Sequence, residues 1–172
     1  HRSPPGDAME VRSRHGLADP YVLYVARLEH PGKNHLRLVQ AFEQLPAVLR
    51  DQYLLVLGGA AWPGSEVITD HVRNSPCRDR IRLLGFVPSE DLPALYHEAA
   101  LYVFPSLYEG FGLSVPEAMA CGTVVACSRN SSLGEVAGEA AITFDPESIP
   151  DLNAALVRGL TDEDERRRRR EL

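Results

Sequence analysis

Short apolar runs rich in β-branched residues alternate with amphipathic stretches along most of this 172-residue chain. This alternation is typical of βαβ units, in which helices cover a mainly parallel sheet. The pattern therefore predicts an α/β fold with about six strands. The predicted strands span residues 21–26, 53–57, 81–84, 101–104, 124–127 and 141–144.

Residues 34–45 predict a helix that packs on the sheet, because apolar side chains recur every third residue and form one face. Ser89 has the character of an N-cap, since two acids follow it in the first turn. Further helices are expected over residues 67–72, 114–120 and 152–160. The chain is therefore expected to divide into three segments: an irregular interdomain connection over 1–20, one domain over 21–160, and the start of a truncated C-terminal helix over 161–172.

Composition narrows the class of protein. A hydrophobic content of 44% with 24% charged residues fits one globular domain. No apolar run of about 18 residues occurs, so no membrane insertion is expected and a cytoplasmic location is the default. Cys77, Cys121 and Cys127 form no C-x-x-C pair and are interpreted as reduced packing residues. The net charge of −6 disfavours duplex nucleic acid as a partner, and the basic run over 166–170 follows acids as in a solvated helix end.

The loop after the first predicted strand carries two cations, Arg27 and Lys33. In a parallel sheet, ligands bind outside the carboxyl ends of the strands, where loops lead into helix N-termini. Two cations beside such an N-terminus suit a diphosphate. Ordinary surface charges are the alternative that this spacing alone leaves open.

The loop after the fourth predicted strand is rich in glycine. Gly110 and Gly112 would let backbone amides approach a ligand, and a predicted helix follows them. Glu109 and Glu117 flank this element, and a carboxylate can accept hydrogen bonds from both hydroxyls of a vicinal diol. One could bind a sugar and the other a ribose, whereas solvated acids without a ligand are the alternative.

Four segments of the chain resemble the C-terminal domain of glycosyltransferase family 4. The similarity extends from about residue 21 to about residue 151, and it includes two glutamates in an E-x7-E pattern and an Arg and a Lys six residues apart. The segments are YVARLEHPGKNHLRLVQAF, RIRLLGFVPSEDLPALYHEAALYVFPS, PSLYEGFGLSVPEAMACGTVVA and SSLGEVAGEAAITFDP.

This resemblance implies a Rossmann-like, three-layer αβα domain with about six parallel strands, which is one half of a GT-B fold. It also implies retaining transfer of a hexosyl group from a nucleotide diphosphate sugar, with no metal and no other cofactor. An enzyme of this kind has a second, N-terminal domain that holds the acceptor and that this chain lacks, so the isolated domain is expected to be inactive.

The same resemblance implies roles for individual residues. Arg27 and Lys33 would neutralise the donor diphosphate and stabilise the leaving group, in place of a metal. Glu117 would bind the ribose, and Glu109 would contact the transferred sugar. Backbone groups would complete the site: those of residues Gly110, Phe111, Gly112 and Leu113 at the sugar and phosphates, and those of Val87 at the nucleobase.

Several alternatives stay open. Glu109 could act as a nucleophile opposite the leaving group, although a sugar-positioning role is favoured. The domain could bind nucleotide sugars without catalysis of its own, or belong to a GT-B-type epimerase or phosphorylase. A dinucleotide dehydrogenase is disfavoured, because no G-x-G-x-x-G follows the first strand. Most histidines, including His30 and His35, are expected at the surface. Mannosyl transfer from GDP-mannose in bacterial polysaccharide biosynthesis and transfer from UDP-glucose are both compatible with the sequence.

Overall fold

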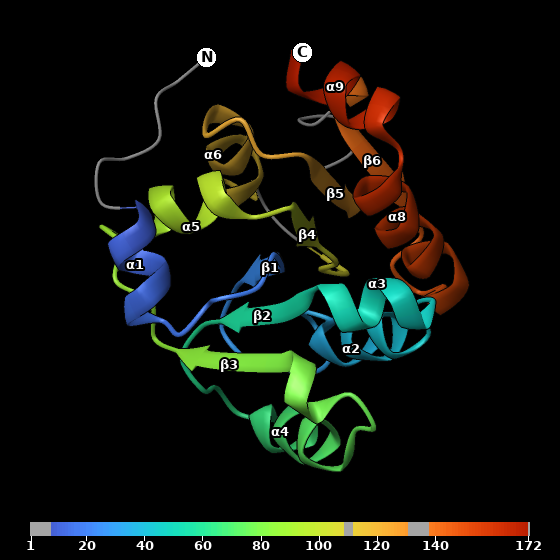
Figure 1. The fold of residues 1–172 in the computed structure, drawn as a ribbon. Coiled ribbons are helices and arrows are strands. Elements are labelled where there is room, and N and C mark those ends of the chain that lie inside the picture. The colour runs from blue at the N-terminus through green and yellow to red at the C-terminus, as the bar shows by residue number, and fades with distance from the viewer. Residues whose placement is uncertain (1–7, 109–111, 131–137, 172) are drawn as a thin grey trace.

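A six-stranded parallel sheet lies at the centre of the computed structural model, which describes residues 8–108, 112–130 and 138–171 (Figure 1). The strand order is β3-β2-β1-β4-β5-β6. The predicted α/β class, with a Rossmann-like parallel sheet, is confirmed. The strands are β1 (Tyr21–Val25), β2 (Leu54–Gly58), β3 (Ile81–Gly85), β4 (Leu101–Phe104), β5 (Val125–Ser128) and β6 (Ala141–Phe144).

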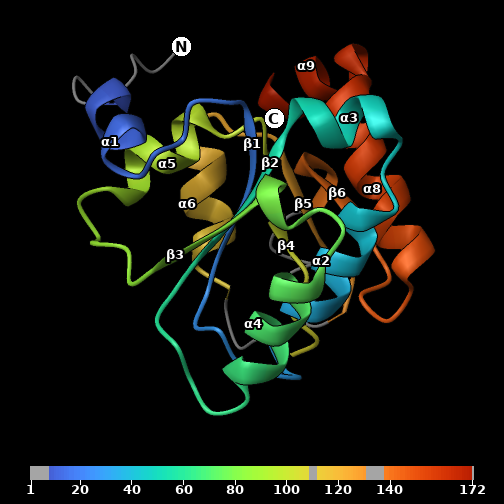
Figure 2. The same cartoon turned by 60° about the horizontal axis from the view of Figure 1, so that its bottom comes forward.

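Helices cover both faces of this sheet (Figures 1 and 2). One layer contains α2 (His35–Glu43), α4 (Ser65–Asn74) and α8 (Ile149–Thr161). The other contains α1 (Ala8–Arg14), α5 (Leu92–Glu98) and α6 (Ser114–Ala120). The remaining described helices are α3 (Ala47–Gln52), α9 (Glu163–Glu171) and the 3-10 turns η1 (Arg78–Arg80) and η2 (Gly138–Ala140). Within the described ranges, none of the helices is long and apolar enough to cross a membrane.

The sheet positions the functional site through its strand order. The central strands β1, β2 and β4 are buried on both faces, which is why their sequences are nearly continuous apolar runs. The order reverses between β1 and β4, which pair in parallel although two other strands separate them in sequence. A reversal of this kind opens a crevice at the carboxyl ends of the two strands, where open α/β sheets bind ligands.

The N-terminal segment differs from the irregular structure expected over residues 1–20. Residues 8–14 form α1, which buries Val11 completely and packs against α5. Polar contacts add to this packing, since Arg14 and His15 each lie 2.8 Å from a carboxylate oxygen of the buried Asp91. Arg12 likewise lies 3.2 Å from Glu98. These partners are about eighty residues away, so the local composition gave no sign of them.

The same contacts explain a correction at the start of α5. Ser89 was expected to be the N-cap, but α5 begins at Leu92 with Asp91 as its N-cap residue. The Asp91 carboxylate does not cap the helix, because it binds the N-terminal segment instead. Pro93 lies in the first turn of α5, where its fixed φ favours the start of a helix.

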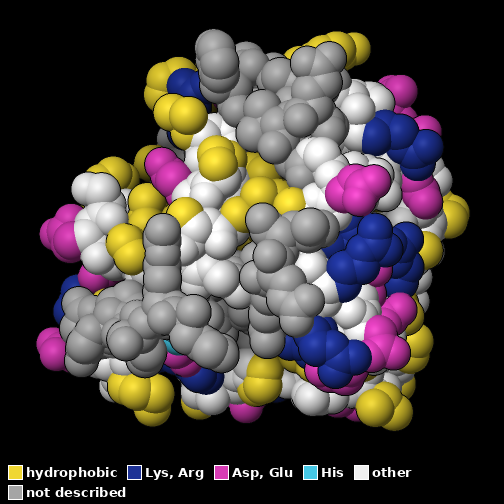
Figure 3. Space-filling model, turned by 90° about the horizontal axis from the view of Figure 1, so that it is seen from above, with side chains coloured by type: hydrophobic (Ala, Val, Ile, Leu, Met, Phe, Trp, Pro, Cys, Tyr) yellow, Lys and Arg dark blue, Asp and Glu magenta, His cyan; other side chains and the backbone are white. Residues whose placement is uncertain are grey.

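Helix α9 carries the basic run at the C-terminal end. Arg166 lies 3.3 Å from Glu163, and Arg169 lies 2.8 Å from Glu165, so acids of the first turn pair with bases of the next. Figure 3 shows basic and acidic side chains interspersed on this face. These pairs agree with a charged helix end, but the side chains of Arg166 and Arg169 are largely buried, so the expectation of a solvated run holds only in part.

Candidate functional site

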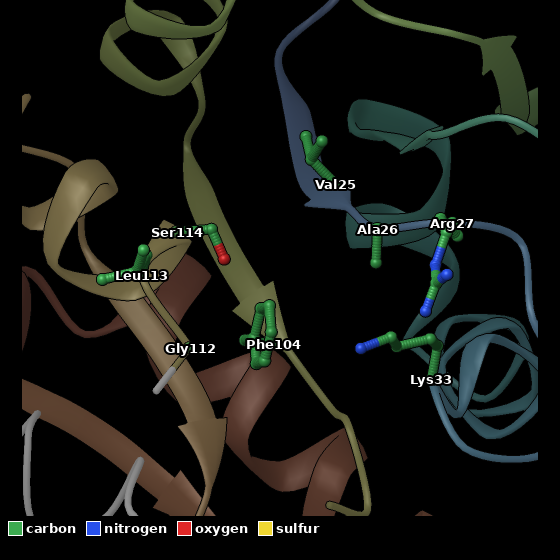
Figure 4. Close-up of a pocket in the computed structure, with 8 residues that line it drawn as sticks. All are labelled: Val25, Ala26, Arg27, Lys33, Phe104, Gly112, Leu113 and Ser114. Carbon is green, nitrogen blue, oxygen red and sulfur yellow. The ribbon is translucent and has the colours of Figure 1, made fainter. Parts of the chain in front are cut away.

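A pocket of about 370 Å³ lies at the carboxyl ends of β1 and β4, where the strand order reverses (Figure 4). Arg27 and Lys33 lie on one side of it, and Gly112, Leu113 and Ser114 lie on the other. The remaining lining residues are Val25, Ala26 and Phe104. Two segments about eighty residues apart in sequence therefore face one another across this space.

Backbone pairing fixes the start of the loop after β1. The amide of Ala26 donates to the carbonyl of Gly58, and the amide of Leu28 donates to the carbonyl of Ala60, both at 2.9 Å. Gly59 has a φ of +150°, and a Cβ at this position would lie 1.8 Å from the carbonyl oxygen of Ala26. Only glycine therefore lets the loops after β1 and β2 run so close together.

The end of the same loop is fixed by Asn34, which is buried in the left-handed conformation at φ 59°. Its side-chain amide donates to the carbonyls of Pro105 and Pro146, at 2.9 and 2.8 Å. Asn is one of the few residues that adopt this conformation at low cost. The amide of Leu107 also donates to the carbonyl of Gly32 at 3.0 Å, so the loops after β1 and β4 are bound to each other.

The two cations lie in different surroundings within this loop. Lys33 extends toward the pocket from the end of the loop (Figure 4). Arg27 is 52% exposed, lies 3.2 Å from the Glu29 carboxylate, and places its guanidinium 4.4 Å from the ring centre of Trp62. Two like charges at one pocket repel each other, and a bound anion would relieve that repulsion.

His35 contradicts the expectation that the histidines near this loop lie at the surface. Its side chain is completely buried as the first residue of α2, and its ring centre lies 4.6 Å from that of Tyr24. Burial lowers the pKa of His35 to about 4, and the nearby charge of Lys33 acts in the same direction, while backbone groups of Ala26 and Glu29 oppose the shift. The imidazole is therefore neutral at pH 7 and adds no third positive charge beside the pocket.

The structure places the other predicted site residues as follows. Gly112, at φ 56°, and the exposed Leu113 line the pocket opposite the two cations. Glu117 is exposed on α6 and is not among the residues that line the pocket. Burial and the charge of Glu117 raise the pKa of Tyr96 on α5, so this carboxylate lies toward that helix.

Val87 is buried just after β3, and it packs against Gly58 rather than lining the pocket. Glu109, Gly110 and Phe111 lie outside the described residues. Among the sites predicted from sequence, the structure therefore brings Arg27, Lys33, Gly112 and Leu113 together around one space.

Sequence reasoning missed some residues around this pocket. Phe104 and Ser114 line it, at the end of β4 and the start of α6. Glu29 and Trp62 contact Arg27 from outside the lining set. A signal for Trp62 was available, because it is the chain's single tryptophan and it follows the second predicted strand. In the described parts of the chain, no group of three or more His, Cys, Asp or Glu residues could hold a metal ion.

Comparison with known proteins identifies one family, both by its sequence model and by similar proteins. The sequence model of "Glycosyl transferases group 1" matches residues 7–171. The chain is 40% identical over 160 residues to O-antigen chain mannosyltransferase B of Escherichia coli, a match that covers 92% of this chain and 42% of that protein. It is 37% identical to the serotype-specific mannosyltransferase WbdA of Escherichia coli, over 89% of this chain and 19% of that one.

Solved structures give the same fold. Sucrose-phosphate synthase from Thermosynechococcus elongatus superimposes with a TM-score of 0.79 at 32% identity, covering 98% of this chain and 45% of that one. HepE from Anabaena, solved with UDP and glucose, superimposes with a TM-score of 0.84 at 23% identity, covering 98% and 46%. This chain spans less than half the length of each of these proteins.

Proposed function

This chain belongs to the group 1 glycosyl transferases, and we propose that it forms the half of such an enzyme that binds the nucleotide-sugar donor. The observation that carries the proposal is the position of Arg27 and Lys33 beside one pocket, opposite the backbone of Gly112 and Leu113. Cations on one side suit a diphosphate, and backbone groups on the other suit a sugar or phosphate. In this proposal the chain is the C-terminal half of a GT-B enzyme of family 4.

The chemistry follows from where charge develops during transfer. The bond between the anomeric carbon and the diphosphate oxygen breaks, and the new bond forms to an acceptor hydroxyl oxygen. Negative charge accumulates on the departing nucleoside diphosphate, so Arg27 and Lys33 stabilise the transition state more than the ground state. With these two cations at the leaving group, the reaction needs no metal in this proposal. Transfer is retaining: the acceptor attacks on the face that the diphosphate leaves, and its proton passes to a phosphate oxygen.

The transferred group is a hexosyl unit, and mannose is the preferred candidate. Two of the similar proteins, at 40% and 37% identity, are named as mannosyltransferases. Glucose from UDP-glucose is the second candidate, since the contacts that would choose between the two sugars include Glu109 and the loop around it. The acceptor would bind to a second domain, so the chain alone binds the donor without transferring the sugar.

The proposal places the enzyme in the cytoplasm. Cys77, Cys121 and Cys127 are free thiols, and two of them are buried. Free thiols at this density are ordinary in a reducing compartment and uncommon in secreted domains of this size.

Calorimetry of the purified chain tests donor binding. UDP, GDP and ADP are titrated in turn, with a chelator present, together with the matching monophosphates. We expect one diphosphate to bind more tightly than its monophosphate, and we expect Lys33→Ala to weaken that diphosphate by about 1.5 to 3 kcal/mol, the scale of a charge-assisted hydrogen bond. Arg73→Ala is the matched control, because Arg73 is an exposed cation on α4 that pairs with Asp70. Equal affinity for monophosphates and diphosphates would contradict the proposal.

A further inference from the structure

The Arg27 guanidinium lies over the ring of Trp62, with 4.4 Å between the guanidinium carbon and the centre of the ring. Trp62 is the single tryptophan of the chain, and it is 47% exposed although it is the largest apolar side chain available for a core. A large aromatic side chain left half in water beside a cation points to a task other than core packing.

The backbone holds this contact in place. The amide of Trp62 donates to the carbonyl of Leu28 at 3.2 Å, and Leu28 forms a parallel bridge with Ala61. The loop then turns at Gly64, where an added Cβ would lie 3.0 Å from the carbonyl oxygen of His30. The loops after β1 and β2 are thus joined on both sides of Arg27, which holds the backbone of Trp62 beside that of Arg27.

Stacking and ion pairing use different parts of a guanidinium. An aromatic ring that covers the face leaves the five N–H donors at the edge available, whereas a carboxylate occupies some of those donors. Glu29 contacts Arg27 at the edge, at 3.2 Å from a terminal nitrogen. This contact is an ion pair without a hydrogen bond, so a diphosphate at the pocket would compete with Glu29 for the charge of Arg27.

We infer that Trp62 is a positioning residue, which holds the Arg27 guanidinium in the orientation that the donor diphosphate requires. This inference rests on the proposed function. Arg27 is 52% exposed, and an arginine side chain at that exposure loses substantial rotamer freedom when a ligand orders it. Because Trp62 restricts the side chain before binding, less of that entropy is lost on binding. Trp62 acts through Arg27 and does not itself contact the phosphates.

The test combines calorimetry with the fluorescence of Trp62. UDP, GDP and ADP are titrated into the unmodified chain and into the variants Trp62→Leu, Trp62→Phe, Arg27→Ala and the double variant Arg27→Ala with Trp62→Leu. Circular dichroism checks that each variant is folded. We expect Trp62→Leu to weaken diphosphate binding about two- to fivefold, the scale of an exposed cation–π contact, and Trp62→Phe to retain most of the affinity. We also expect Arg27→Ala to change the emission of Trp62 in the ligand-free chain.

The double variant separates positioning from direct contact. If Trp62 acts through Arg27, Trp62→Leu has no further effect once Arg27 is alanine, as a double-mutant cycle would report. The inference is overturned if Trp62→Leu still lowers the diphosphate affinity in the Arg27→Ala background. It is also overturned if Trp62→Leu binds the diphosphate as tightly as the unmodified chain while Arg27→Ala binds it more weakly. Absence of binding by the unmodified chain itself would overturn the proposed function, and the inference with it.

Discussion

The phenol of Tyr24 on β1 donates a hydrogen bond of 2.9 Å to the backbone carbonyl of Lys33. Tyr24 is completely buried, and its hydroxyl also lies 3.1 Å from that of Ser106 in the loop after β4. One buried hydroxyl thus connects the sheet to both loops that border the pocket. The backbone of Lys33 is therefore held by a residue that does not line the pocket.

We expect Tyr24→Phe to lower the free energy of unfolding by about 1 kcal/mol, because the Lys33 carbonyl loses a buried donor. Diphosphate binding should weaken by a smaller factor than in Lys33→Ala, since the charge remains but its anchoring is loosened. Urea denaturation and calorimetry with UDP and GDP measure the two effects. Tyr53→Phe is the control, because Tyr53 is also buried but contacts Gln52, away from the pocket. A loss of diphosphate affinity in Tyr24→Phe as large as that in Lys33→Ala would contradict the view that Tyr24 only anchors the loop that carries the Lys33 charge.

The buried imidazole of His35 predicts a pH dependence of stability. Its pKa is about 4 in the folded chain and about 6.5 when unfolded, so the unfolded state binds more protons between these values. The contribution of His35 to stability is therefore present above pH 6.5 and falls as the pH is lowered toward 4. The full loss is roughly 3 kcal/mol.

Replacement of His35 by leucine should remove this part of the pH dependence. Urea denaturation at pH 7 and pH 5 gives the difference in unfolding free energy for each protein, and we expect a smaller difference in His35→Leu. His97→Gln is the control, because His97 is a partly exposed histidine on α5 beside Glu98. An unchanged difference in His35→Leu would show that His35 does not carry this effect.

The strands could be predicted from the sequence, whereas two helices could not. The strands are short runs rich in apolar residues, so their positions agree with the prediction to within one or two residues, although the edge strand β3 is mostly exposed. Helix α3 buries none of its residues, so it has no apolar stripe to detect. Helix α1 depends on Asp91 and Glu98, which come from a distant part of the chain.

The candidate site was predictable in part: Arg27, Lys33, Gly112 and Leu113 were all expected at one site, and all four line one pocket. The spacing of Arg27 and Lys33 placed both at one loop, and the structure places both at one pocket. The contact between Arg27 and Trp62 depends on the pairing of the loops after β1 and β2, which no local pattern encodes. The burial of His35 depends in the same way on Tyr24, eleven positions before it.

The two glutamates of the E-x7-E pattern are expected to act on different parts of the donor. We predict that Glu117→Ala weakens binding of nucleosides and nucleotides alike, because a ribose contact is lost in both. Glu109→Ala should weaken binding of the nucleotide sugar only. Calorimetry with uridine, UDP and UDP-glucose, and with the guanosine series including GDP-mannose, measures both effects. Equal losses for every ligand in both variants would contradict the assignment.

Glu29 is predicted to oppose donor binding through its pairing with Arg27. Its carboxylate lies 3.2 Å from the guanidinium and adds negative charge beside a site that we propose for a diphosphate. Glu29→Gln should therefore raise the affinity for UDP or GDP by about two- to fivefold at low ionic strength, the scale of an exposed ion pair. The gain should shrink at high salt, because mobile ions screen exposed charges. Glu163→Gln on α9 makes the same change in net charge where the residue pairs with Arg166, so it separates a local effect from a global one. If Glu29→Gln instead weakens diphosphate binding, the carboxylate helps to orient Arg27. Glu29 would then be a positioning residue together with Trp62.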